Sequence, residues 1–547
     1  MSDAPDAVVV GAGPNGLVAA NMLADAGWRV LVLEAQPEPG GAVRSDRGVH
    51  PDYVNDLFSS FYPLAAASPT IRALELERWG LEWSHAPAVL ANPFPDGSCA
   101  VLHRDREDTA RNLETFAPGD GEAYLRLTEL WDRLGPDLLN AFLTPFPPVR
   151  PVLSAVAKLR AAGGLRLLRM MLLPVRRLGE EEFDGPGAPI LLAGCALHAD
   201  IFPESTAGTI YGWLLAMMGQ EVGWPVPSGG AGMLTAALVR RLESRGGTVR
   251  CGARVAKVVV AGGRALGVVT DDGEAVRARR AVLADVSAPA LYGGLVDREH
   301  LPAQLRDDIR RFQWDTSTVK VDWALSGPIP WTSPEAAGAG TVHLAESMDH
   351  LTRHSAQLAT GAVPDRPFCL VGQMTTADPV RSPAGTESAW AYTHVPQRVR
   401  EDAGGAGITG AWGPGEREAM ADRMEAEIER RAPGFRDRVL ARRVLAPPDL
   451  EARDENLVGG ALNGGTAAVH QQLFFRPVPG LGRAGTPVRG LYLASSSAHP
   501  GGGVHGACGA NAARAALAAE RPLAHYLLGP AQAALHRAVT RTEGRPR

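Results

Sequence analysis

The sequence predicts an α/β protein with a Rossmann-type parallel sheet, in a chain long enough to hold a second domain. Two observations lead to this fold class. The first fifty residues follow the order strand, glycine-rich turn, helix and strand, which is the order of a dinucleotide-binding βαβ unit. Short apolar runs then return near residues 281 and 491, as further buried parallel strands would.

The opening βαβ unit carries a G-x-G-x-x-G turn. Residues 7–10 form an apolar, β-branched run typical of a buried strand, and Gly11, Gly13 and Gly16 follow it. The first glycine permits a tight turn and the second lets the backbone approach a pyrophosphate. The third lets the helix predicted over residues 14–26 pack close to the strand. The amides of the first helical turn are then free to bind phosphate.

An acidic residue closes the second strand of this unit. Residues 30–33 are the predicted strand and Glu34 follows directly. A carboxylate there accepts hydrogen bonds from ribose hydroxyls and repels a 2′-phosphate, so NADP is disfavoured. Because every part occurs in the required order, the pattern favours an intact dinucleotide site over a doubly wound domain that has lost its ligand.

Composition excludes several function classes. A chain of 547 residues can hold two or more domains, and its net charge of −5 gives no indication of nucleic-acid binding. The five cysteines are scattered without a C-x-x-C pair, which excludes a disulfide reductase, and no metal-ligand spacing occurs. The sequence shows neither a secretory signal nor an apolar stretch long enough for a membrane span. The expected setting is cytoplasmic.

The middle of the chain is predicted to alternate between helices and strands. We expect a helix from the glycine-rich segment 227–233 to Arg245, strands over 248–251, 253–260, 266–270 and 281–285, a hairpin at Gly262-Gly263, and further strands over 317–325 and 388–394. Lys320 lies inside one of these strands. From the pattern alone, a lysine that reaches solvent is the more common case.

A basic, apolar segment covers residues 150–178. No acidic residue occurs between residues 138 and 179. One interpretation is peripheral contact with anionic membrane lipid. The favoured alternative is a surface helix whose arginine stems cover apolar neighbours, because Gly163, Gly164 and Pro174 are expected to break a long helix.

The C-terminal part repeats the strand, glycine loop and helix pattern. Residues 491–494 are a predicted buried strand, Gly501 to Gly503 form a loop that accommodates phosphate or flavin, and an alanine-rich helix follows from Val504. The N-terminus of such a helix favours negative charge on a bound group.

Residues Pro39–Arg44 resemble the G-G-x-x-R extension of FAD-binding flavoproteins. The whole chain resembles the phytoene desaturase-like flavoproteins of the amine oxidase and carotenoid desaturase superfamily. It is nearer to the branch named for pyridine nucleotide-disulfide oxidoreductase domain-containing protein 2 than to the carotenoid desaturases proper. The motifs that carry the resemblance are Val8–Gly16 with Glu34, Pro39–Arg44, Pro227–Met233, Ser317–Leu325, Asp378–Gly385 and Leu491–Gly509. The chain departs from the family pattern at Ala494–Ser497, where the family has a glycine-containing run.

The resemblance implies a Rossmann-type FAD-binding domain assembled from the discontinuous segments 1–75, 225–300 and 481–530, and an α+β substrate domain made of 76–224 and 301–480. Residues 531–547 form a basic tail. It also implies noncovalent FAD held by Gly11, Gly13, Gly16, Glu34, Gly40, Gly41 and Arg44. The adenine would lie near Val255, and the isoalloxazine ring against Gly502, Gly503 and Val504. In amine-oxidase-like relatives a strand lysine holds a water near flavin N5, and Lys320 matches that position by motif.

We therefore expect an FAD-dependent dehydrogenase or desaturase. It would take hydride from a small, largely apolar substrate, isoprenoid or lipid-like, onto flavin N5, with oxygen or a quinone as electron acceptor. Lys320 and His499 are the candidate catalytic residues, for proton handling and anion stabilisation. One alternative is amine oxidation, for which Trp314, Tyr392 and Trp390 are the candidates for an aromatic cage. Another is an FAD-stabilised binding or regulatory protein with little turnover.

Overall fold

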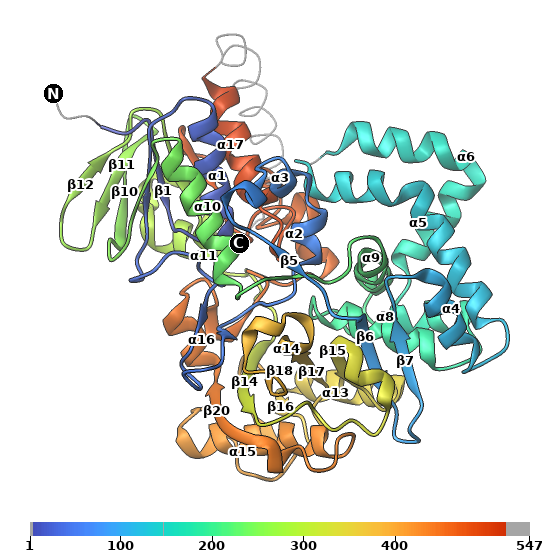
Figure 1. Cartoon of the computed structure of the whole chain (residues 1–547). Coiled ribbons are helices and arrows are strands. Elements are labelled where there is room, and N and C mark those ends of the chain that lie inside the picture. The colour runs from blue at the N-terminus through green and yellow to red at the C-terminus, as the bar shows by residue number, and fades with distance from the viewer. Residues whose placement is uncertain (1–3, 146, 521–547) are drawn as a thin grey trace.

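A five-stranded parallel sheet forms the centre of the first domain (Figure 1). The computed structural model describes residues 4–145 and 147–520. The strand order is β21 (Leu491–Leu493), β13 (Ala281–Ala284), β1 (Ala7–Val10), β2 (Val30–Leu33) and β9 (Thr248–Arg250), with every pair parallel. The strands come from the beginning, the middle and the end of the chain. The predicted α/β, Rossmann-type fold is therefore confirmed, whereas the boundaries of the two domains stay a prediction.

The two faces of the parallel sheet are covered differently. On one face α1 (Pro14–Asp25) packs against α10 (Gly232–Ser244) and α17 (Ala507–Ala519). The other face packs against a three-stranded antiparallel sheet of β10 (Val255–Ala261), β11 (Arg264–Thr270) and β12 (Ala275–Arg277). The predicted hairpin at Gly262-Gly263 joins β10 to β11. The C-terminal helix begins later than predicted, at Ala507, because Gly506 before it has a left-handed φ of +68°.

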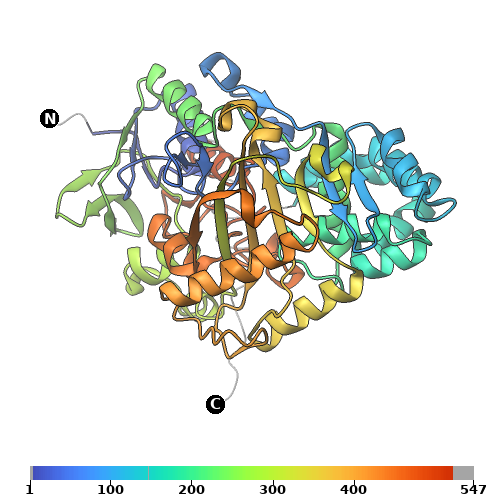
Figure 2. The ribbon, with the colours of Figure 1, turned by 60° about the horizontal axis from the view of Figure 1, so that its bottom comes forward.

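The second domain is built on a seven-stranded sheet. Its order is β20 (Val439–Leu445), β14 (Ser317–Leu325), β18 (Glu387–Val395), β17 (Cys369–Gln373), β15 (Ala339–Leu344), β6 (Ala88–Pro93) and β7 (Cys99–Leu102). The β15–β6 pair is parallel and the other pairs are antiparallel. The helix α15 (Pro414–Glu429) packs on one face (Figure 2). The helices α8 (Gly187–Leu197) and α9 (Gly208–Glu221) pack with β6 and β7 in a separate core.

Two long helices lie side by side at one end of the molecule, α5 (Asp120–Leu143) and α6 (Val149–Leu172) (Figure 1). The helix α6 continues through Gly163 and Gly164, so the expectation that these glycines break a long helix is wrong. A helical glycine costs only about 1 kcal/mol, and contacts of α6 with α5 and α9 offset that cost. Pro174 does separate α6 from α7 (Val175–Glu182).

The helix α6 carries exposed leucines, and several basic residues in and after it form ion pairs. The exposed leucines are Leu153, Leu165, Leu168 and Leu172. The ion pairs are Lys158–Asp137, Arg169–Glu181 and Arg176–Glu204. Peripheral membrane contact through residues 150–178 stays a prediction. No helix in the described ranges is long and apolar enough to cross a bilayer. The basic tail over 531–547 lies outside the described residues.

Candidate active site

One continuous cavity of about 660 Å³ runs from the carboxyl ends of the parallel strands to the seven-stranded sheet. Gly11, Glu34 and Asp285, which follow β1, β2 and β13, line its first part. Residues of β14, β18, α8 and α9 line the rest. Its volume is within the range of small-molecule and cofactor sites, and the ends of parallel strands are where such folds bind ligands.

The glycine-rich turn leaves no room for side chains. Gly11 has a φ of +94°, and a Cβ there would lie 2.7 Å from the carbonyl oxygen of Asp285. A Cβ at Gly13 would lie 2.8 Å from Asp285 Oδ2, and one at Gly16 would lie 2.3 Å from the Gly11 carbonyl oxygen. Gly11 and Gly13 line the cavity, whereas Gly16 sits behind them and its amide donates to Asp285 Oδ2 at 2.7 Å. Gly11 and Gly13 therefore present backbone without side chains to the cavity, which lets a bound pyrophosphate approach the turn closely.

Several buried polar atoms of the cavity wall have no hydrogen-bond partner among the residues that the structure describes. They are Asn15 Oδ1, Ser60 Oγ and Thr318 Oγ1. The helix α1 also begins without a side-chain cap, which leaves its N-terminal amides for an anion. Because buried polar groups in native proteins are nearly always hydrogen-bonded, the cavity fits a large polar ligand such as a dinucleotide.

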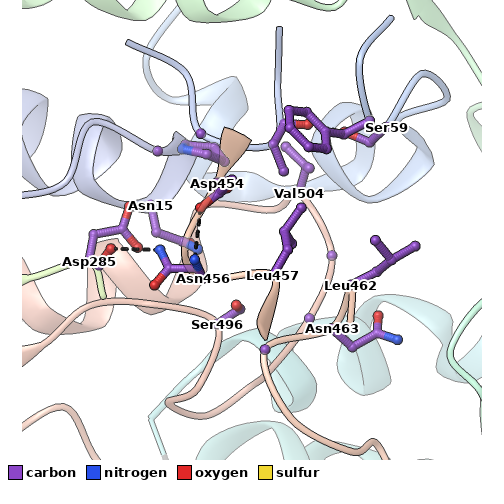
Figure 3. Close-up of a pocket in the computed structure, with 18 of the residues that line it drawn as sticks. Asn15, Ser59, Asp285, Asp454, Asn456, Leu457, Leu462, Asn463, Ser496 and Val504 are labelled. Atoms are coloured by element: carbon purple, nitrogen blue, oxygen red, sulfur yellow. Dashed lines mark hydrogen bonds between the residues drawn. The ribbon is translucent and has the colours of Figure 1, made fainter. Parts of the chain in front are cut away.

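Acidic residues surround the turn, and burial raises the pKa of two of them, Asp285 and Asp454. Glu34 accepts hydrogen bonds from the amides of Ala12 at 2.7 Å and Gln36 at 2.8 Å. Burial raises the pKa of Asp285 to about 8, so this carboxyl stays largely protonated at neutral pH and repels a diphosphate little. Burial raises the pKa of Asp454 to about 6. Figure 3 shows Asn456 between these two acids, with its side chain donating to the Asp285 carbonyl at 3.1 Å.

The loop that contains Gly40, Gly41 and Arg44 packs against the glycine turn. Gly41 lines the cavity, and a Cβ at Gly40 would lie 2.7 Å from the carbonyl oxygen of Val43. Arg44 does not line the cavity: its Nε donates to the Gly41 carbonyl at 2.9 Å, and a second nitrogen donates to the carbonyl of Arg453. In this position Arg44 supports the loop that borders the cavity, and its contact with FAD stays a prediction.

Two other arginines do line the cavity, Arg254 and Arg453. Arg254 forms an ion pair with Glu455. Val255, predicted to meet the adenine, follows Arg254 on the wall.

The C-terminal glycine loop forms another wall. Gly502, Gly503 and Val504 all line the cavity (Val504 in Figure 3). Arg476 is fully buried and donates to the carbonyls of Asn463 at 2.8 Å and Ser496 at 2.7 Å. It thereby ties the loop around residue 463 to the segment before the glycines.

His499 lies outside the cavity wall. Its Nε2 is 3.0 Å from the carbonyl oxygen of Thr144, and the next residue, Pro500, is the one that lines the cavity. Burial lowers the pKa of His499 to about 4, so the ring is neutral. The structure therefore does not bring His499 together with the other predicted site residues.

Lys320 is buried, so the expectation of a solvent-exposed side chain is wrong. Its Nζ donates to the carbonyl of Asp56 at 2.8 Å and forms an ion pair with Asp322. Asp322 is also paired with Arg443 at 2.8 Å. Burial lowers the pKa of Lys320, the ion pair opposes that shift, and the residue lines the cavity. A lysine held in this way can hold or move a proton at Nζ.

Another part of the cavity wall is apolar and aromatic. The apolar side chains are Phe61, Leu64, Phe142, Ile210, Leu214, Leu215 and Met218. Trp390 and Tyr392 stack with their ring centroids 5.9 Å apart and also face the cavity. Trp314 does not line it and packs against Phe312 instead. Two of the three aromatic candidates are thus brought together.

Sequence reasoning missed most of the wall that comes from loops. Asp285 is the last residue of the strand predicted over 281–285, much as Glu34 closes the strand before it, so its position was a usable signal. Asp454, Asn456 and Asn463 belong to short polar loops without a motif, and only the fold shows that they face the cavity (Figure 3).

The comparisons with known proteins agree with this geometry. Residues 15–353 match the model of the flavin containing amine oxidoreductases. Pyridine nucleotide-disulfide oxidoreductase domain-containing protein 2 of Mus musculus is 31% identical, over 93% of this chain and 92% of its own. Phytoene dehydrogenase of Streptomyces griseus is 29% identical, over 82% of this chain and 83% of its own. The solved structure of cyclohexylamine oxidase from Brevibacterium oxydans, 15% identical, has a TM-score of 0.55 over 98% of this chain and 100% of its own, which shows a shared fold.

These matches and the glycine turn identify the ligand of the cavity as FAD and the protein as an oxidoreductase. The chain belongs to the flavin containing amine oxidoreductase family.

Proposed function

We propose that this oxidoreductase removes hydride from a C–H bond of a small, largely apolar substrate. One observation carries the proposal: the glycine turn and the apolar side chains of α9 line the same continuous cavity. FAD, when bound, supplies the two-electron acceptor. The similarity to a phytoene dehydrogenase supports an isoprenoid or lipid-like molecule as the substrate.

The residues of the chain position the substrate and handle protons. Ile210, Leu214 and Met218 bury the apolar part of the substrate and exclude water from the reacting carbon. We assign proton handling to Lys320, which lines the cavity and is held in place by its ion pair with Asp322. Oxygen or a quinone is the proposed electron acceptor.

Amine oxidation is the second candidate, and the stacked pair Trp390–Tyr392 is the observation that favours it. Aromatic faces attract cations. However, Lys320 Nζ already lies 5.9 Å from the centroid of the Trp390 ring. A substrate ammonium would therefore meet a like charge, which favours an uncharged substrate.

An anaerobic reduction experiment tests the proposal. The FAD-loaded protein is mixed without oxygen with an isoprenoid alcohol, an isoprenoid hydrocarbon or a long-chain amine, and the flavin absorbance is followed. We expect bleaching by an isoprenoid compound and recovery on admitting air or a soluble quinone. Bleaching by the amine alone would support amine oxidation instead. If photoreduced protein reoxidises but no compound bleaches it, the result would support a binding or regulatory protein.

A further inference from the structure

A pair of histidines touches the cavity beyond the lysine, and the proposed reaction does not use it. His198 follows the end of α8 and lines the cavity, next to Cys195, Trp224 and Tyr392. His343 lies behind it on β15 and is fully buried. The two Nε2 atoms are 2.9 Å apart, so one of them donates a hydrogen bond to the other.

The surroundings of His343 decide which ring donates. Its Nδ1 is buried, has no hydrogen-bond partner in residues 4–145 and 147–520, and faces the backbone at Gly194, where a Cβ would lie only 2.1 Å away. Burial lowers the pKa of both rings, so each is neutral and carries one N–H. A buried N–H without an acceptor is rarer than an unused acceptor lone pair. The proton of His343 therefore belongs on Nε2, which donates to His198.

This assignment leaves the proton of His198 on Nδ1. Within the described part of the chain, that nitrogen has no hydrogen-bond partner, and it is not fully buried, since the ring borders the cavity. The Trp224 ring packs edge-on against His198 at 5.1 Å between centroids and fixes the imidazole. Tyr392, 6.5 Å away between centroids, pairs in register with Lys320. A substrate that fills the cavity past Lys320 therefore meets an oriented N–H donor beside the rings of Trp224 and Tyr392.

We propose that His198 determines specificity by donating from Nδ1 to an uncharged oxygen acceptor, a carbonyl or hydroxyl oxygen, on an otherwise apolar substrate. A pure hydrocarbon would leave this donor unpaired, and an ammonium group has no acceptor to offer. His343 is a positioning residue, because it acts only through His198. The inference rests on the proposed function in one respect, namely that the cavity past Lys320 is the substrate site.

Ligand binding to the FAD-loaded protein tests this without turnover. The probes are methyl octyl ketone, its methylene isostere in which CH₂ replaces the carbonyl oxygen, and decylamine, each titrated against the flavin difference spectrum. A hydrogen bond to an otherwise unpaired buried donor corresponds to about 1–3 kcal/mol, so the ketone is expected to bind about 5- to 150-fold more tightly than its isostere. Equal affinity for ketone and isostere, or tighter binding of decylamine, would overturn the proposal.

Variants separate the donor from the shape of the cavity. His198→Phe keeps a ring beside Trp224 and is expected to abolish the preference for the ketone. Its affinity for the isostere is expected to stay within about twofold, given that no hydrogen bond is involved. His198→Asn, which retains an N–H, is expected to restore part of the preference. Cys195→Ala, one turn earlier on α8 and facing the same cavity, is the matched control and should keep the preference intact.

The outcomes are distinguishable from failure of the proposed function. A protein that binds the ketone selectively but is never reduced by any oxygen-bearing apolar compound would refute the hydride transfer and keep the role of His198. A protein that is reduced by pure hydrocarbons and shows no preference for the ketone would refute the role of His198 and keep the hydride transfer.

Discussion

The substitution Gly509→Ala tests whether the two ends of the chain meet at the cofactor turn. Gly509 lies in the first turn of α17, and a Cβ there would lie 1.8 Å from the carbonyl oxygen of Asn15 and 2.7 Å from its carbonyl carbon. Both neighbours are backbone atoms of α1, so no side-chain rotation relieves the clash. The two helices must move apart, and Asn15 lines the cavity.

The expected cost follows from overpacking between rigid helices. Such overpacking costs about 1–3 kcal/mol, and contact between two backbones places this variant at about 3 kcal/mol. With an unfolding entropy of about 2.1 cal/mol/K per residue, a chain of 547 residues loses roughly 3 °C in Tm. Displacement of α1 from α17 also separates the phosphate turn from the C-terminal glycine loop, so the Kd for FAD is expected to rise by at least about tenfold, or 1.4 kcal/mol.

The assay is the FAD content after dialysis, with Tm measured on the loaded protein and on the apoprotein. Gly415→Ala is the matched control, because Gly415 also lies in the first turn of a helix, α15, and nothing is within 4 Å of a Cβ there. If the Gly509→Ala protein retains as much FAD and as high a Tm as the control, the close packing of α1 on α17 is not what closes the site.

Three further predictions concern buried charges. The guanidinium of Arg381 contacts Asp56 at 3.0 Å and Asp378 at 2.8 Å, so Arg381→Met leaves both carboxylates without this cation. We expect the free energy of unfolding, measured with denaturant, to fall by about 3–5 kcal/mol. Adding Asp56→Asn to this variant should recover part of the loss if charge is the cause. Lys320→Met is expected to slow flavin reduction by the substrate at least about 100-fold, the usual contribution of a general acid or base, with FAD content unchanged; an unaltered reduction rate in stopped flow would argue against proton handling by this lysine. Asp285→Asn tests whether the pKa of Asp285 in the folded protein is about 8, against an ordinary value of 3.8. Because the folded state binds the proton more tightly, the stability of the wild type falls as pH rises from about 4 to 8. The Tm of the variant apoprotein minus that of the wild-type apoprotein should therefore increase from pH 5 to 8, and a constant difference would contradict the buried protonated acid.

The parts of the fold that local spacing determines were predictable from the sequence. The strand over 317–325 is β14 with the same bounds, and β1, α1 and β2 follow the glycine pattern closely. Each depends on a period of apolar residues or on a turn within a few residues. The glycines on the cavity wall were predictable for the same reason.

The partners of the buried polar residues were not predictable in this way. Lys320 is held by Asp56, 264 residues before it, and Arg44 by the carbonyl of Arg453, 409 residues after it. A strand pattern shows which face a side chain takes but not whether a distant segment covers that face. From the strand pattern alone Lys320 therefore looked exposed, and from the motif Arg44 looked available to contact FAD.

The same long-range contacts indicate that FAD binding depends on the folding of nearly the whole chain. Asp285, whose carboxyl accepts from the Gly16 amide 269 residues earlier, shapes the phosphate turn from β13. Its own carbonyl oxygen accepts from Asn456, farther along the chain. An N-terminal βαβ fragment would carry every residue of the glycine motif and still lack the strand and the loop that hold the turn in its binding conformation. Because a ligand that binds only the folded state stabilises it by mass action, FAD should stabilise both domains together, and loss of the C-terminal glycine loop should release it.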